Sequence, residues 1–145
     1  MNLSAETNLR RVMETLGERI APVLTEGFAV EVLRLAGLVL AISTNSIDDA
    51  AAIRAAENET MRLLLGDAAG VVRDTALAAR LSAAAAIAGS GLKISELDAA
   101  GDALRNLIIE LHAHVETLEG CAARNIDQRI WRMLKDFEAA RAPRR

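Results

Sequence analysis

Residues 30–43 read VEVLRLAGLVLAIS, the most apolar stretch of the chain, and Arg34 stands in its middle. The pattern predicts a helix from about Gly27 to Ile42, and its second half, from Leu35 onward, is apolar nearly all round. Such a helix normally lies at the centre of a bundle. Because a charged side chain is seldom buried without a partner, Arg34 requires one.

Glu57 is the best candidate partner for Arg34. At 100° per residue, the next predicted helix turns Glu57 toward the same third of its circumference as four core-type residues, namely Ile53, Thr60, Met61 and Leu64. We therefore expect a buried ion pair between these two helices. The alternative is that Arg34 pairs with Glu31, one turn back on its own helix.

The composition favours an all-α fold. Alanine, leucine, glutamate and arginine dominate the sequence, and these residues have high helix propensity. Tyrosine is absent, and no segment alternates apolar and polar residues over the length of a strand.

The spacing of apolar residues predicts five or six helices. Their connections are short, so we expect a compact, mostly antiparallel bundle that forms one domain over residues 1–145, with a short flexible basic tail from about 142. Gly66 is the expected C-terminal cap of the third helix, and Ser95 with Asp98 the expected capping box of the fifth. The predicted segments are Ser4 to Pro22, Gly27 to Ile42, a helix that begins near Asp48 and Asp49 and ends at Leu65, Val71 to Ala88, Ser95 to Gly120, and Ala122 to Arg141, closed by Pro143.

Size and charge limit the classes of function. A chain of 145 residues is long enough to bury about two-thirds of its unfolded surface. The formal net charge of −3 provides no strong attraction to nucleic acid or to an anionic membrane. Cys121 is the only cysteine, and arginine greatly outnumbers lysine. We expect a bacterial, cytoplasmic protein that does not bind nucleic acid or membranes.

Residues that commonly carry chemistry are poorly arranged here. His112 and His114 diverge by about 200° on one helix and cannot share a metal ion, even with Glu110 nearby. Cys121 begins the last predicted helix, where a thiol pKa is lowered, but no histidine accompanies it at a readable spacing. We therefore expect no catalytic residues, no metal and no cofactor.

Basic residues and the single tryptophan gather in the last predicted helix. This face is either simply solvated or a contact surface for an acidic protein partner, since arginine and tryptophan are favoured contact residues. The residues predicted for that surface are Trp131, Arg124, Arg132 and Lys135.

The run from Phe28 to Ile42, followed by AAENETMRLLLG at 55–66, resembles a small uncharacterised helical bacterial family. Members of that family are encoded beside aminoglycoside-phosphotransferase-like proteins and acyl-CoA dehydrogenases. Arg34, Glu57 and Gly66 fall on its pattern, whereas Leu38 stands where a polar asparagine is expected. The resemblance covers about Pro22 to Gly66 and implies an accessory role near acyl-CoA metabolism.

Two functions remain open from the sequence. The first is a non-catalytic accessory, regulatory or protein-interaction domain that acts through a protein partner or as a homodimer. The second is a domain or enzyme that binds a small anionic or acyl-linked molecule. In that case Arg34 would hold the anion, Glu57 would orient it or act as a base, and Glu31 would lie nearby.

Overall fold

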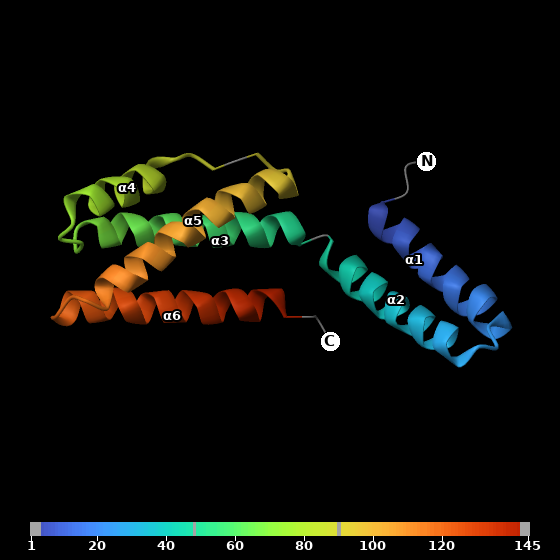
Figure 1. Cartoon of the computed structure of the whole chain (residues 1–145). Helices are drawn as coiled ribbons and strands as arrows, with labels where there is room; N and C mark the ends of the chain where they lie inside the picture. The colour runs from blue at the N-terminus through green and yellow to red at the C-terminus, as the bar shows by residue number, and fades with distance from the viewer. Residues whose placement is uncertain (1–3, 48, 90, 143–145) are drawn as a thin grey trace. The chain divides into compact units, whose positions relative to one another are not determined.

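The computed structural model describes residues 4–47, 49–89 and 91–142, and within them it contains six α-helices and no strand, which confirms the all-α fold (Figure 1). Successive helices are joined by short connections, as the sequence predicts. The helices are α1 (Ala5–Thr15), α2 (Gly27–Ser46), α3 (Ala50–Ala69), α4 (Thr75–Ala86), α5 (Ile94–Val115) and α6 (Cys121–Arg141).

The chain divides into two compact units. From the sequence we expect one domain over residues 1–145, but the contacts between residues form one unit up to Ala50 and another from Ala51 to Ala142. Each unit is therefore described by itself. The predicted basic tail and the closing Pro143 lie outside the described residues.

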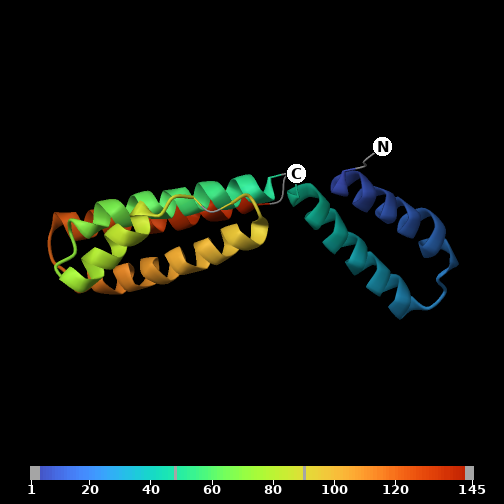
Figure 2. The same ribbon diagram turned by 90° about the horizontal axis from the view of Figure 1, so that it is seen from above.

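The first unit is a hairpin of α1 and α2, which lie side by side in both ribbon views (Figures 1 and 2). Ser4 caps α1 by accepting a hydrogen bond from the Thr7 amide, as predicted. The chain then passes through a π-helical turn, Leu16–Ile20, and a 3-10 turn, Ala21–Val23, which contains Pro22. Pro22 is expected to kink or end the first helix, because proline has no amide hydrogen. Helix α1 itself ends at Thr15, and the two turns carry the chain through Pro22 to Val23, after which Leu24 is extended.

Helix α2 is longer than expected. The predicted end near Ile42 is wrong, because the polar run from Ser43 to Ser46 completes the last turn. Thr44 Oγ1 donates to the Leu40 carbonyl at 2.8 Å, and Ser46 Oγ donates to the Ser43 carbonyl at 3.1 Å. Bonds of this kind satisfy hydroxyl groups inside a helix, so the polar run does not end it. The expected helix-start role of Asp48 lies outside the described residues.

The second unit is a four-helix bundle of α3 to α6. Its fully buried side chains come from all four helices and include Met61, Leu65, Leu81, Leu111 and Ile130. The prediction that Gly66 caps α3 is wrong, since the helix continues to Ala69. A Cβ at Gly66 would lie 3.3 Å from the Cβ of Ala85, so this glycine lets α4 approach α3 closely.

The starts of α4 and α5 also differ from the predictions. Asp74 caps α4, and its carboxylate accepts hydrogen bonds from the amides of Ala76 and Leu77 at 2.9 and 3.0 Å. Helix α5 begins at Ile94, after Lys93, so the predicted Ser95–Asp98 capping box is not formed. Asp98 instead accepts a hydrogen bond from Arg54 on α3.

The cap at Asp74 makes stability dependent on pH. The two backbone hydrogen bonds lower the pKa of the Asp74 carboxyl below its usual value. A carboxyl whose pKa is lowered by folding stabilises the protein above its unfolded pKa of about 3.9, and this contribution is lost as the pH falls through the lower folded value.

We expect Asp74→Ala to destabilise the bundle at pH 7, and Asp74→Asn to have a smaller effect because asparagine can still cap the helix. Below about pH 3 the advantage of the native aspartate over asparagine should disappear. Urea unfolding followed by circular dichroism at both pH values measures this, with the exposed Asp136→Ala as control. An advantage of aspartate that persists undiminished in acid would contradict the charged cap.

Candidate functional site

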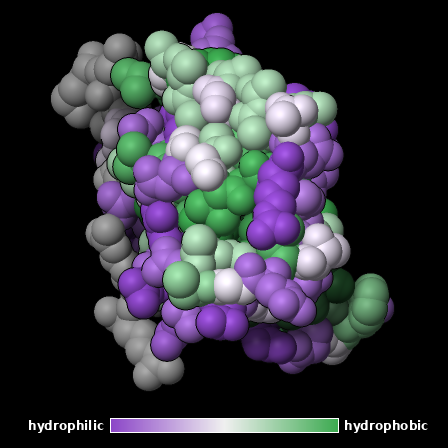
Figure 3. Space-filling view, turned by 90° about the vertical axis from the view of Figure 1, so that its left-hand side faces the viewer, coloured by the Kyte–Doolittle hydropathy of each residue, from purple (hydrophilic) through white to green (hydrophobic). Residues whose placement is uncertain are grey.

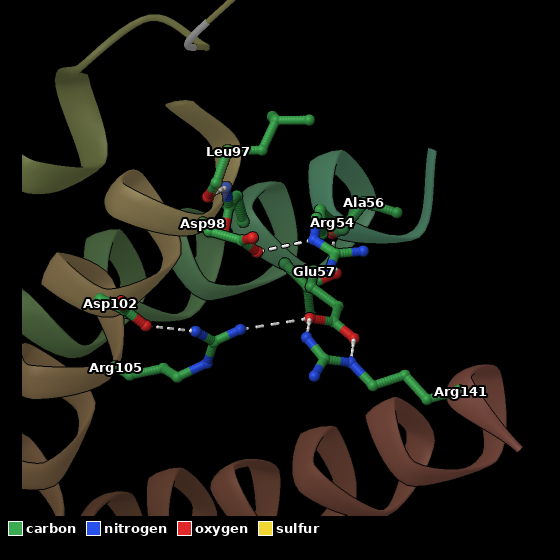
Figure 4. Close-up of polar contacts among 10 residues, drawn as sticks. Arg54, Ala56, Glu57, Leu97, Asp98, Asp102, Arg105 and Arg141 are labelled. Atoms are coloured by element: carbon green, nitrogen blue, oxygen red, sulfur yellow. Dashed lines mark hydrogen bonds and ion pairs between the residues drawn. The ribbon is translucent and has the colours of Figure 1, made fainter. Parts of the chain in front are cut away.

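The most buried charge in the described residues is the carboxylate of Glu57 on α3, which is 3% exposed (Figure 4). Arg141, in the last turn of α6, donates to its two oxygens at 2.6 and 2.5 Å. Arg105 on α5 lies 3.5 Å from one of the same oxygens. Glu57 therefore ties α3 to both α5 and α6, and the paired geometry with Arg141 is the strong form of this interaction.

A polar network continues from Glu57 along α3 and α5 (Figure 4). The side chain of Asn58 is almost fully buried, and its Nδ2 donates to the Leu97 carbonyl at 2.8 Å. A Cβ at Gly101 would lie 2.8 Å from Asn58 Oδ1, so the glycine leaves room for this amide. Arg54 and Asp98 add a bond of 2.6 Å between the same two helices.

Arg34 does not have the partner that we expected. Its Nε donates to Glu31 at 2.8 Å, which is the alternative pairing one turn back on α2. Both side chains are more than 60% exposed. The physical reason is that this side of α2 is open to solvent, so Arg34 keeps its hydration and needs no buried counter-charge. Glu57 takes its partners from α5 and α6 instead.

Arg141 ends the last helix, a position where an arginine is typical of a solvated helix end. Sequence spacing does not show which helices meet, so it does not predict the pair with Glu57. The hydrogen bond with Glu57 raises the pKa of the Arg141 guanidinium, so it remains a cation over the whole working pH range.

We expect Arg141→Met to lower the free energy of unfolding by about 3 kcal/mol, because Glu57 would stay buried with only the more distant Arg105 nearby. Arg34→Met removes an exposed pair of the same kind and should cost less than about 1 kcal/mol. Chemical denaturation of the two variants measures both effects. Equal losses would show that burial of Glu57 does not control the strength of its pair.

A hollow of about 400 Å³ lies in the hairpin between α1 and α2, with Arg34 on its rim. Its walls are mostly apolar and include two glycines, Gly17 in the π-helical turn and Gly37 on α2, at which a Cβ would meet no atom within 4 Å. Because Glu31 takes only the Nε donor, the two terminal nitrogens of Arg34 remain for another acceptor.

The predicted contact residues on α6 are all exposed. Trp131 is 59% exposed, and its ring meets the ring of His112 on α5 edge to face, with centroids 5.6 Å apart. His112 Nε2 is in turn 3.0 Å from a carboxylate oxygen of Asp127. Trp131 is therefore largely exposed, yet its ring packs against that of His112.

One depression is lined by this tryptophan and a second by its neighbour His112. The first, of about 420 Å³, lies at the start of α6 and is lined by Trp131, Asp127 and Arg124 among others. The other, of about 220 Å³, is an apolar groove between α5 and α6 whose walls include Ile109, Leu134 and Phe137. Figure 3 views the bundle from the end where α5 passes into α6, and hydrophobic side chains gather in the middle of this face between hydrophilic ones.

The remaining candidate residues take structural positions. Glu110 accepts two hydrogen bonds from Arg80 on α4, and Cys121 is exposed at the first position of α6. His114 Nε2 is buried without a hydrogen-bond partner among the described residues. In that part of the chain, no three histidine, cysteine or acidic side chains are grouped to hold a metal ion.

Comparison with protein-family models, with curated proteins and with solved structures finds no match to this chain. The resemblance drawn from residues 28–66 therefore stays a prediction. By length and composition, α2 is long and apolar enough to cross a membrane, which is weak evidence by itself because core helices and signal sequences meet the same criteria.

Proposed function

We propose that the chain is a non-catalytic accessory protein that docks a protein partner on the surface formed by Ile109, His112, Trp131 and Leu134, hereafter the α5–α6 surface. The observation that carries the proposal is Trp131, a large side chain that is mostly exposed and yet held against His112. Tryptophan is among the residues that contribute most to protein interfaces, and a side chain already held in place loses little entropy on binding.

The α5–α6 surface has the anatomy of an interface. Its centre is apolar, since Ile109 and Leu134 are 66% and 45% exposed and flank a groove. Its border carries the cations Arg124, which lines a depression with Trp131, and Lys135, one turn along α6 from Trp131, and neither forms an ion pair with other described residues. Arg132 lies instead on the α3 side of α6, in a depression with Thr60 and Leu64. An apolar centre with a polar border is typical of protein contacts, and cations at the border favour an acidic partner.

Ion pairs between helices give several ionisable groups of the bundle a structural role. Glu57, which is buried, and Glu110 and Asp67, which are exposed, each pair with an arginine of another helix. Trp131, Ile109 and Leu134 on the α5–α6 surface remain exposed without such a role.

The docking proposal is tested with a photo-crosslinking amino acid at position 109, expressed in the source cells. We expect one adduct of defined mass, and Trp131→Ala in the same protein should reduce its yield at least about tenfold, as loss of a central contact residue does. Ile87 is the matched control, since it is the same residue type and is 64% exposed at the C-cap of α4. No adduct at 109, or equal adducts at both positions, would sink the proposal.

A second candidate function rests on the hairpin hollow. Its apolar walls and the free nitrogens of Arg34 suit a small apolar molecule with a carboxylate or phosphate group. Glu57 has no role in this second candidate function, because its carboxylate pairs with Arg141 and Arg105.

We expect straight-chain fatty acids to raise the melting temperature of the protein, and Gly37→Leu to abolish the shift by filling the hollow. The exposed Ala36→Leu is the control and should keep it. If Gly37→Leu responds to the acids as the native protein does, the ligand does not enter this hollow.

A further inference from the structure

Helix α2 has two apolar faces, and α1 packs against one of them. The less exposed positions, Ala29, Leu33, Gly37, Leu40 and Thr44, recur at helical spacing and belong to the α1 side. At 100° per residue, a second set is centred about 140° away from them. This set, hereafter the α2 stripe, consists of Phe28, Val32, Leu35, Val39 and Ile42, which are between 48% and 76% exposed.

The α2 stripe has the spacing of a coiled-coil contact. Its members are separated by four, three, four and three residues, the alternation that keeps one seam facing a partner helix. Val32 and Val39 occupy one class of position, and Phe28, Leu35 and Ile42 occupy the other. β-Branched residues in the first class with larger residues in the second favour a pair of helices.

The size of the α2 stripe also fits a helix pair. With Leu38 beside it, which is 52% exposed, the stripe presents roughly 600 Å² of apolar side chain, at about 100 Å² for each half-exposed residue. A stable dimer buries about 800 Å² on each partner. The stripe alone therefore supplies most of the surface that a dimer needs.

We propose that the α2 stripe is the contact between two copies of this chain, which associate through their α2 helices about a twofold axis. A twofold contact uses the same patch on both copies, so one self-complementary stripe is sufficient. This contact is distinct from the α5–α6 surface and does not depend on it.

A second copy fits the α2 stripe better than a lipid bilayer does. The 20 residues of α2 are long enough to span the ~30 Å of a hydrocarbon core, but Glu31 and Arg34 would then lie inside it, where charged side chains are costly. The first 50 residues hold seven acidic and four basic side chains, so they carry the whole net charge of −3. An anionic membrane surface would repel them.

The test is the mass of the full chain in solution, measured by sedimentation and light scattering over a range of concentrations. We expect a dimer, and Leu35→Asp should weaken association at least about a hundredfold because the change enters the contact twice. Leu63→Asp, at a 62% exposed leucine on α3, is the matched control and should leave the dimer intact. Leu35→Gln, which keeps helix propensity, guards against a trivial loss of folding, and circular dichroism checks that both variants keep their helix content.

A native chain that stays monomeric overturns the proposal, as does a dimer that Leu35→Asp and Leu35→Gln leave unchanged. Flotation with vesicles of neutral and of anionic lipid tests the alternative, in which the α2 stripe binds a membrane. A monomer that binds vesicles through an intact α2 stripe, and loses binding in Leu35→Asp, would assign the stripe to lipid. None of these outcomes affects crosslinking from position 109, so the two proposals fail separately.

Discussion

The buried carboxylate of Glu57 is the constraint on which the four-helix bundle depends. A charge that is 3% exposed has lost nearly all its hydration and must recover that energy from the protein. Two cations from different helices do so, and they can reach Glu57 only when α5 and α6 have a particular register on α3. Hydrophobic contacts such as those of Leu65 and Leu111 stabilise the bundle but depend little on the exact register of the helices. The ion pairs of Glu57 depend on it, because any other register leaves a buried charge without a partner.

Arg34 and Glu57 are both charged residues that the sequence places among apolar ones, but their environments in the structure are opposite. Glu57 is buried and forms ion pairs with two arginines, whereas Arg34 is exposed to solvent and pairs with Glu31. The difference lies in what covers each helix. Three neighbours surround α3, whereas α2 is covered by α1 along one face. The apolar character of a helix therefore predicts that it will be covered, but not by what.

Local signals predicted local structure well. Ser4 caps α1 and Pro22 lies in the turn that follows it, because capping and the missing proline amide act within a few residues. The errors came where a distant neighbour decides the outcome. From the sequence Gly66 resembles a helix cap, but it is a glycine position where Ala85 on α4 approaches α3 closely. Asp98 accepts a hydrogen bond from Arg54 on α3 rather than capping its own helix. The α6 residues predicted for a contact surface are exposed, which follows from helical period alone, and their role in contact stays a prediction. The partner of Glu57 was missed, because Arg141 lies 84 residues away.

The two units differ in how far they can sustain themselves. The bundle buries side chains from all four of its helices, whereas Thr44 is the only buried residue among residues 4–47. A pair of helices that buries so little has little to offset the entropy of ordering its backbone. Covering the apolar surface of the hairpin would therefore also stabilise its fold. By linkage, a molecule that binds the folded hairpin also stabilises it. Under the proposed dimerisation, order in α1 and α2 would rise with protein concentration, and assembly and folding of the hairpin would be a single equilibrium.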